Sequence, residues 1–200
     1  MNNRKRTALC LLGAALCVFM TFGAALALGR YPITPAALLA GDAMAVRTFT
    51  VLRLPRAVMA LIGGFGLGAA GFVYQTVFRN PLASPDIIGV SSGASVGAAF
   101  AILTGAPNWA VQAAAFAGGV AAVAASYLIS RKSAHSHTLS LVLTGSMIMA
   151  LCNAGVTMIK YVADPNDVLQ QITFWLMGSL TKTDMDAFLW SFPPMAAGLA

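Results

Sequence analysis

The side chains that could do chemistry in this chain are few and scattered. His135 and His137 share one loop that holds no carboxylate or thiol, so a solvated turn is favoured over a metal site. No serine or threonine has a partner base nearby, which an activated nucleophile requires. The three cysteines lie in apolar runs and form no CxxC pair. The sequence therefore predicts no catalytic residue, no metal site and no cofactor bound directly by the chain.

Two polar side chains, Gln75 and Asn153, lie in or near long apolar runs. A hydrogen bond between helices is the ordinary role of such a residue in a membrane, with a contribution of about 0.6 kcal/mol. A place along a transport path is the alternative. The six acidic residues, all aspartates, lie outside these runs, so no buried ionisable group for proton coupling is expected.

The composition excludes several classes of protein. Apolar residues make up 58% of the 200 residues and charged residues only 9%, against about 25% charged in soluble domains. So few charges cannot cover a soluble globule, and the hydrophobicity is too high for a disordered chain. The twelve lysines and arginines are scattered between apolar runs, whereas a nucleic-acid binder gathers them on one face. An integral membrane protein, with a lipid bilayer and no nucleic acid as partner, is what remains.

Long uncharged runs predict the membrane helices. A crossing helix needs roughly 20 apolar residues, and five runs meet or approach this length: 7–28, 57–78, 87–103, 110–129 and 139–159. A sixth run begins near residue 187 and is still apolar at residue 200. We expect an all-α, polytopic transmembrane helix bundle with about six helices, in one domain over residues 1–200.

Both ends of the chain leave an alternative. The sixth run has no polar cap, which favours a C-terminally truncated chain over a kinked half-helix at Pro193-Pro194. The first run follows Arg4-Lys5-Arg6 and could be a signal peptide, but its length favours a membrane helix. The same basic cluster predicts a cytoplasmic N-terminus. Alternation then places residues 79–86 and 131–138 inside, and residues 29–56, 104–109 and 160–186 outside.

Two helices outside the spans are also expected. Residues 35–44 begin with a proline, which suits the first turn of a short surface helix. Residues 165–180 carry a helical apolar stripe. This second helix either lies at the outer interface or re-enters the protein.

Small residues at spacings of four predict close helix contacts. Gly64 and Gly68 form one such pair, and Gly89, Gly93 and Gly97 form a second series. Such residues let helix backbones approach in a membrane, where water cannot drive association. Gly68 also belongs to a GxGxxG match, but the match lies inside an apolar run without a preceding strand, so we interpret it as accidental.

Two stretches resemble the FecCD-type permeases, the membrane subunits of ABC importers. One is Leu52-Arg-Leu-Pro-Arg56, followed by a Gly-rich run and Gln75-x-x-x-Arg-Asn-Pro-Leu-Ala-Ser-Pro-Asp-Ile-Ile-Gly-Val-Ser-Ser-Gly-Ala94. The other is Leu141-Val-Leu-Thr-Gly-Ser146, followed by Phe174-Trp-Leu-Met-Gly-Ser-Leu180. The likeness extends from about residue 7 to the end of the chain.

The resemblance implies a function and a set of partners. It implies a permease subunit of an ATP-driven importer for an iron chelate (siderophore), haem or cobalamin, in the cell inner membrane. It implies a homodimer with about ten helices per subunit, a periplasmic or lipoprotein binding protein, and two cytoplasmic ATPase subunits that use the ATP. The alternatives are an intramembrane enzyme and a truncated, non-transporting fragment.

Site residues follow from the residue types and the resemblance together. Arg53 and Arg56, at the outer mouth of the second helix, suit carboxylates of a docking binding protein, and anchoring at the interface is the alternative. The inner turn near the ATPase comprises Asn80, Pro81, Leu82 and Pro85, and a structural hairpin is the alternative. The matching helix lines the family's central pathway, and here it carries the candidate lining residues Thr144, Ser146, Met147 and Asn153.

Overall fold

The computed structural model describes residues 3–132, 137–181, 183 and 185–199, and it contains helices and no strands within them. In chain order the elements are α1 (Asn3–Ala27), α2 (Pro35–Leu39), α3 (Ala43–Arg47), the π-helix η1 (Thr48–Arg53), α4 (Leu54–Phe78), the 3-10 helix η2 (Pro85–Ile88), α5 (Val90–Leu103), α6 (Asn108–Ser130), α7 (His137–Val162), α8 (Val168–Met177) and α9 (Met185–Leu199). This confirms the prediction of an all-α, polytopic helix bundle.

Four helical segments of the described chain are long and apolar enough to cross a membrane: Arg4–Ala27, Ala43–Phe78, Asn108–Ser130 and Thr138–Val162. They match four of the five predicted runs. The fifth, residues 87–103, is interrupted at Gly89, which adopts a left-handed conformation with φ +82°. Only the 14 residues of α5 follow as regular helix, about 21 Å at 1.5 Å per residue.

The chain forms two compact units, Met1–Phe65 with Leu180–Ala200, and Gly66–Ser179. Helix α4 begins in the first unit and ends in the second. The expectation of a single domain over residues 1–200 stays a prediction.

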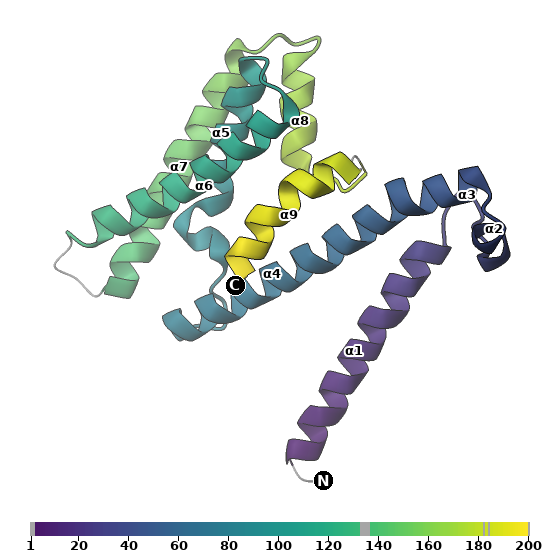
Figure 1. The fold of residues 1–200 in the computed structure, drawn as a ribbon. Coiled ribbons are helices and arrows are strands. Elements are labelled where there is room, and N and C mark those ends of the chain that lie inside the picture. The colour runs from purple at the N-terminus through teal and green to yellow at the C-terminus, as the bar shows by residue number, and fades with distance from the viewer. Residues whose placement is uncertain (1–2, 133–136, 182, 184, 200) are drawn as a thin grey trace. The chain divides into compact units, whose positions relative to one another are not determined.

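Helices α5, α6 and α7 lie side by side in the second unit, with the α5–α6 and α7–α8 connections at the same end (Figure 1). Small side chains fill the contact between α5 and α6. Its buried residues are Ala98, Ala101, Val111 and Ala115. Because few of these side chains extend beyond a methyl group, the two helix backbones come close together, as membrane helices with small contact residues do.

Helix α8 is the helix that the apolar stripe over residues 165–180 predicts. It packs in the second unit through Ile172, which is fully buried against Ala99 of α5 and Ala163 at the end of α7. Several partly buried side chains surround this cluster, among them Ile102, Leu103 and Leu176. A single isoleucine therefore fixes the buried face of a ten-residue helix.

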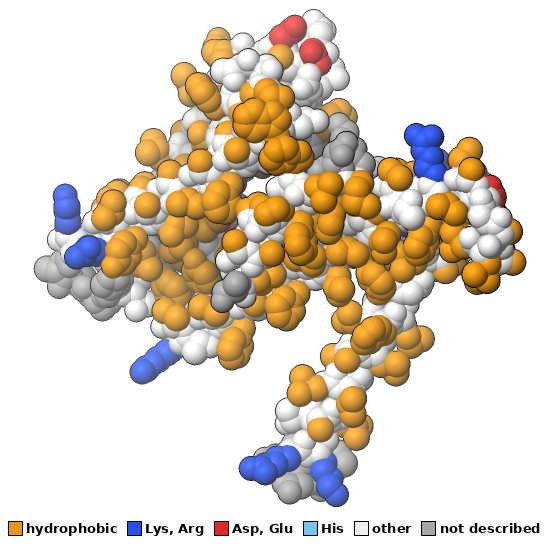
Figure 2. All heavy atoms as spheres, viewed as in Figure 1, with side chains coloured by type: hydrophobic (Ala, Val, Ile, Leu, Met, Phe, Trp, Pro, Cys, Tyr) orange, Lys and Arg blue, Asp and Glu red, His pale blue; other side chains and the backbone are white. Residues whose placement is uncertain are grey.

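Helix α1 is apolar on all sides and none of its most apolar segment is buried within the chain. Figure 2 shows hydrophobic side chains along its length and basic side chains at its N-terminal end. A helix with no polar face suits a hydrocarbon environment. This surface is therefore fit for lipid, or for further helices of a membrane assembly.

The surface helix expected at residues 35–44 is two short helices. Thr34 caps α2 by accepting a hydrogen bond from the Ala37 amide at 3.2 Å. Gly41, with φ +72°, then breaks the helix, and Asp42 caps α3 by accepting from the Met44 amide at 3.1 Å. The prediction of one continuous helix is wrong because a left-handed residue ends α2 and a new cap begins α3.

Candidate functional site

The arginine motif lies where a π-helix meets a proline. The amide of Leu54 donates to the Phe49 carbonyl, which widens the turn just before Pro55. A proline ring clashes with the carbonyl four residues earlier and cannot donate a hydrogen bond to it. The wide turn therefore lets the helix from α3 continue through Pro55 into α4, with Arg53 and Arg56 on either side of the proline.

The guanidinium of Arg53 binds the end of α1. Its Nη1 donates to the carbonyls of Leu26 and Ala27, both at 2.8 Å, and its Nη2 donates to the Tyr31 carbonyl. The last carbonyls of a helix have no partner within the helix and carry its negative dipole end, so a cation is favourable there. Arg53 is half-buried and serves its own chain.

Arg56 also turns toward its own chain. Its Nη2 donates to the carbonyl of Thr181 at 2.5 Å, and its Nε is buried without a hydrogen-bond partner among the described residues. Arg53 and Arg56 are thus both half-buried, and both bind backbone carbonyls of the first unit. Their role in docking stays a prediction.

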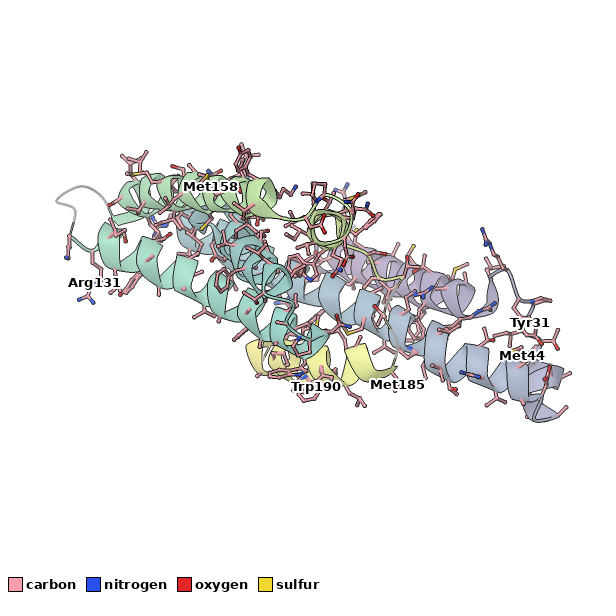
Figure 3. All side chains as sticks on the ribbon, turned by 90° about the horizontal axis from the view of Figure 1, so that it is seen from above. Tyr31, Met44, Arg131, Met158, Met185 and Trp190 are labelled. Carbon is pink, nitrogen blue, oxygen red and sulfur yellow. The ribbon has the colours of Figure 1, made fainter. Side chains whose placement is uncertain are left out.

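Two other arginines of the first unit are exposed. Arg30 and Arg47 have no hydrogen bond or ion pair with the described part of the chain. Tyr31 and Asp42 lie between these two arginines in the sequence, and the Tyr31 hydroxyl donates to the Asp42 carboxylate at 3.2 Å. Figure 3 shows Tyr31 close to Met44. Desolvation and the Asp42 charge raise the pKa of Tyr31, so its hydroxyl stays a donor. Arg30 and Arg47 lie in the predicted outer segment but outside the Leu52–Arg56 motif, so no motif in the sequence indicated a role for them.

The turn after α4, which is predicted to lie on the inner side, has a fixed shape. The Asn80 amide donates to the Gln75 carbonyl and the Arg79 amide to the Thr76 carbonyl, with Arg79 left-handed at φ +48°. This pattern ends a helix in a Schellman motif. The Asn80 side chain then accepts from the Leu82 amide at 2.9 Å, as its residue type predicts.

Within this turn Pro81 is exposed, Pro85 is half-buried and begins η2, and Leu82 has 86% of its surface exposed. An apolar side chain that projects this far from a polar turn is available for a protein partner.

The predicted glycine contacts divide into two groups. A Cβ at Gly93 would lie 2.5 Å from the Gly118 carbonyl oxygen, and one at Gly97 would lie 2.1 Å from the Ala114 carbonyl oxygen. A Cβ placed on Gly64 or Gly68 would meet no described atom from outside its own helix backbone within 4 Å, so the described residues make no close contact at this pair. The face of α4 that carries the pair is exposed.

Gly89 and Gly145 form a third close approach. A Cβ at Gly145 of α7 would lie 2.2 Å from the Ile87 carbonyl oxygen, while Gly89 supplies the positive φ that joins η2 to α5. Ser126 adds a buried hydrogen bond, from its hydroxyl to the Ile88 carbonyl at 3.0 Å. The sequence analysis missed Gly118 and Gly145, although their small size in apolar runs was a signal for them.

The four candidate pathway residues of α7 do not share a face. Thr144 is 8% exposed and its hydroxyl donates to the Ser140 carbonyl, and its role as a lining residue stays a prediction. Ser146, Met147 and Asn153 are exposed, Met147 to 69%. No hydrogen bond to the Asn153 amide group occurs in the described chain. The exposed face of α7 thus combines polar groups with an adaptable methionine.

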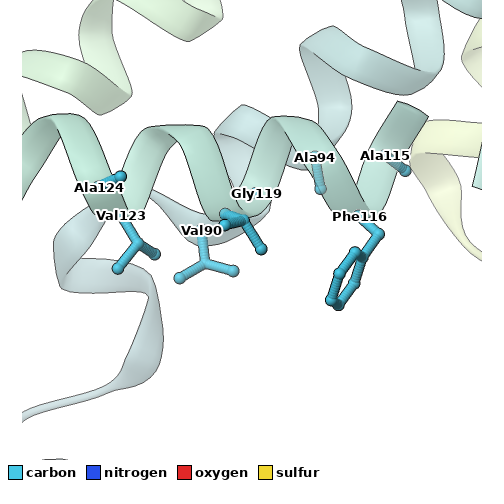
Figure 4. A pocket seen from close by; sticks show the side chains of 8 residues that line it. Val90, Ala94, Ala115, Phe116, Gly119, Val123 and Ala124 are labelled. Carbon is cyan, nitrogen blue, oxygen red and sulfur yellow. The ribbon is translucent and has the colours of Figure 1, made fainter. Parts of the chain in front are cut away.

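Other candidates for a site carry little chemistry. An open groove on α5 and α6 is lined by apolar side chains such as Val90, Phe116 and Val123 (Figure 4). Among the described residues no three metal-ligating side chains come together. His135 lies outside the described residues, and the structure describes no side chain for His137.

Four helices long and apolar enough to cross a membrane, together with close glycine contacts between α5 and α6, are the features of a multi-pass helical membrane protein. The chain belongs to the FecCD transport family, whose profile matches residues 14–200. This family is a transport family and not a class of enzymes.

Named relatives agree with this assignment. The chain is 33% identical to the molybdate import system permease protein MolB of Haemophilus influenzae over 194 residues, which cover 92% of this chain and 58% of that protein. It is 34% identical to the Fe(3+)-citrate import system permease protein YfmE of Bacillus subtilis, over 90% of this chain and 55% of that protein. It is 38% identical to the vitamin B12 import system permease protein BtuC of Escherichia coli, over 66% of this chain and 41% of that protein. The chain thus spans about half the length of the curated relatives it matches.

One solved structure matches the fold over most of the chain. It is described as an inward-facing conformation of a metal-chelate type ABC transporter, with a TM-score of 0.83 and 34% sequence identity. The match covers 94% of this chain and 59% of that one.

Proposed function

We propose that the chain is the permease subunit of an ATP-driven importer and forms part of the path for an iron chelate or a related metal cofactor such as haem or cobalamin. The observation that carries this proposal is the FecCD match over residues 14–200. The relatives named for Fe(3+)-citrate and vitamin B12 import support the substrate class. The MolB relative makes molybdate the competing substrate.

The assembly that we propose has three kinds of component. Two copies of the permease form a homodimer in the cell inner membrane, each with its N-terminus in the cytoplasm. Two ATPase subunits bind and use ATP on the cytoplasmic side, so the permease needs no cofactor of its own. A periplasmic or lipoprotein binding protein delivers the substrate from the outside.

Features of the structure support these contacts. The inner turn with Leu82 exposes an apolar side chain suited to a hydrophobic contact on an ATPase subunit. Arg30 and Arg47 expose two guanidinium groups, which form bidentate pairs with the carboxylates of a docking protein. The driving energy must come from ATP, since a shift from 1:99 to 99:1 between inward and outward states needs about 5.5 kcal/mol.

The test is reconstitution. The native gene product is co-purified with the ATPase encoded beside it, inserted into lipid nanodiscs, and assayed for ATP hydrolysis with a binding protein loaded in turn with ferric siderophore, haem, cobalamin or molybdate. We expect stimulation by one of the first three. Stimulation by molybdate alone would overturn the substrate class, and no stimulation by any ligand would overturn the importer.

Substitutions on the two faces of α7 should separate transport from stability. Asn153→Leu is expected to lower uptake about tenfold, because one polar contact to the passing substrate is lost, while the melting temperature stays unchanged. Thr144→Val keeps the buried volume and is expected to leave uptake unchanged. Uptake of labelled substrate in proteoliposomes measures both. Equal uptake by wild type and Asn153→Leu would remove Asn153 from the path.

A further inference from the structure

The first arginine of the Leu52–Arg56 segment makes contacts that docking would not require. Three hydrogen bonds join its guanidinium to the carbonyls of Leu26 and Ala27, the last two residues of α1, and of Tyr31, four residues beyond the helix. These residues lie 22 to 27 positions earlier in the chain. All three acceptors are backbone carbonyls, which every residue type provides. On the donor side, the contact depends on the geometry of the arginine fork.

Gly29 completes this arrangement. A Cβ on Gly29 would lie 2.5 Å from Arg53 Nη2 and 2.9 Å from Arg53 Cζ. Gly29 has no positive φ, so its backbone conformation does not require a glycine. The missing side chain instead leaves space for the guanidinium of Arg53. A glycine between Leu28 and Arg30 therefore leaves room for an arginine that arrives from another helix.

The carbonyls that Arg53 binds are those that need a partner. A helix leaves its last carbonyls without hydrogen bonds from its own amides, and they carry the negative end of the helix dipole. Leu26 and Ala27 are the last two residues of α1. The Arg53 cation supplies both the donors and the charge at this end.

We propose that Arg53 is a positioning residue, an intramolecular clamp with Gly29 that holds the outer end of α1 against the start of α4. The clamp also fixes the segment that follows α1, where the exposed Arg30 precedes Tyr31. It removes Arg53 from any docking surface and leaves Arg30 and Arg47 as the free guanidinium groups of the outer segment. The clamp itself does not depend on the proposed transport function.

A double-mutant cycle tests the clamp in the full chain in lipid nanodiscs. Gly29→Ala and Arg53→Gln should each lower the melting temperature by about 4 °C or more. Each should also raise amide hydrogen exchange in residues 24–31 about tenfold. The double variant should resemble either single variant, because each change removes the same contact. Arg53→Lys should recover part of the loss.

Two matched controls separate the clamp from general effects. Gly23→Ala changes a glycine within α1 whose Cβ would meet no described atom within 4 Å, and it should show no loss. Arg47→Gln removes an exposed arginine and should leave exchange in residues 24–31 unchanged. Additive losses in the cycle, or wild-type exchange in Arg53→Gln, would overturn the proposal. Weaker association of Arg53→Gln with a binding protein, at wild-type exchange, would return Arg53 to the docking surface.

Discussion

Gly97→Ala is expected to destabilise the second unit by about 2–3 kcal/mol, the largest effect that we anticipate for the addition of one methyl group. The new Cβ would lie 2.1 Å from the Ala114 carbonyl oxygen and 2.8 Å from the Ala114 carbonyl carbon. Both atoms belong to the backbone of α6, so no side chain can move aside. The two helices must separate, which opens the contact formed by Ala98, Ala101 and Ala115.

Gly68→Ala is the matched control. Gly68 lies in the same unit, on α4, and a Cβ there would meet no described atom within 4 Å. Alanine is a better helix former than glycine, so this change should raise stability by up to about 1 kcal/mol. Thermal unfolding in a mild detergent compares the two variants. Equal melting temperatures for Gly97→Ala and wild type would show that α5 and α6 do not meet at Gly97.

Ile172→Ala is expected to release α8 from the second unit. Ile172 has no exposed surface, and it alone among the residues of α8 is fully buried. Truncation of a buried isoleucine leaves a cavity and costs about 2–5 kcal/mol. In a membrane protein the loss is one of dispersion contacts with Ala99 and Ala163. Hydrogen exchange in residues 168–177 should therefore approach that of an exposed helix.

Phe174→Ala provides the comparison on the same helix. Phe174 is 63% exposed, so its truncation should leave the exchange of residues 168–177 close to that of the wild type. If residues 168–177 exchanged equally slowly in Ile172→Ala and Phe174→Ala, contacts other than those of Ile172 would hold α8 in place.

The fold class could be predicted because the chain offers the backbone few alternatives. In lipid, every backbone amide and carbonyl of an uncharged run must form a hydrogen bond within the protein. A single helix satisfies nearly all of these groups without a partner segment. The four long spanning segments, and the helix over Val168–Met177, therefore follow from the positions of apolar residues alone. The turn after α4 was similarly predictable, because Asn80 and the two prolines restrict the backbone within a few residues.

The glycine contacts illustrate the limit of a local pattern. Gly64 and Gly68 have the same spacing as Gly93 and Gly97, and both pairs lie in apolar helices. Only the second pair meets another backbone in the described chain. The spacing shows that one face of a helix carries small residues, but it does not show which helix packs against that face. The same holds for α7, where Thr144 faces inward and Ser146 outward although only two positions separate them.

By itself the sequence determined that this is a multi-pass helical membrane protein, because hydrophobic length and local turn chemistry act over a few residues, while the permease type followed from the resemblance of two stretches to a known family. The tertiary structure alone decided which side chains are free to meet a partner. The carbonyl that Arg56 binds lies 125 residues away in the chain, and those that Arg53 binds belong to another helix. An arginine binds whichever carbonyls the packing of distant segments brings within reach, and no spacing within the motif encodes that packing.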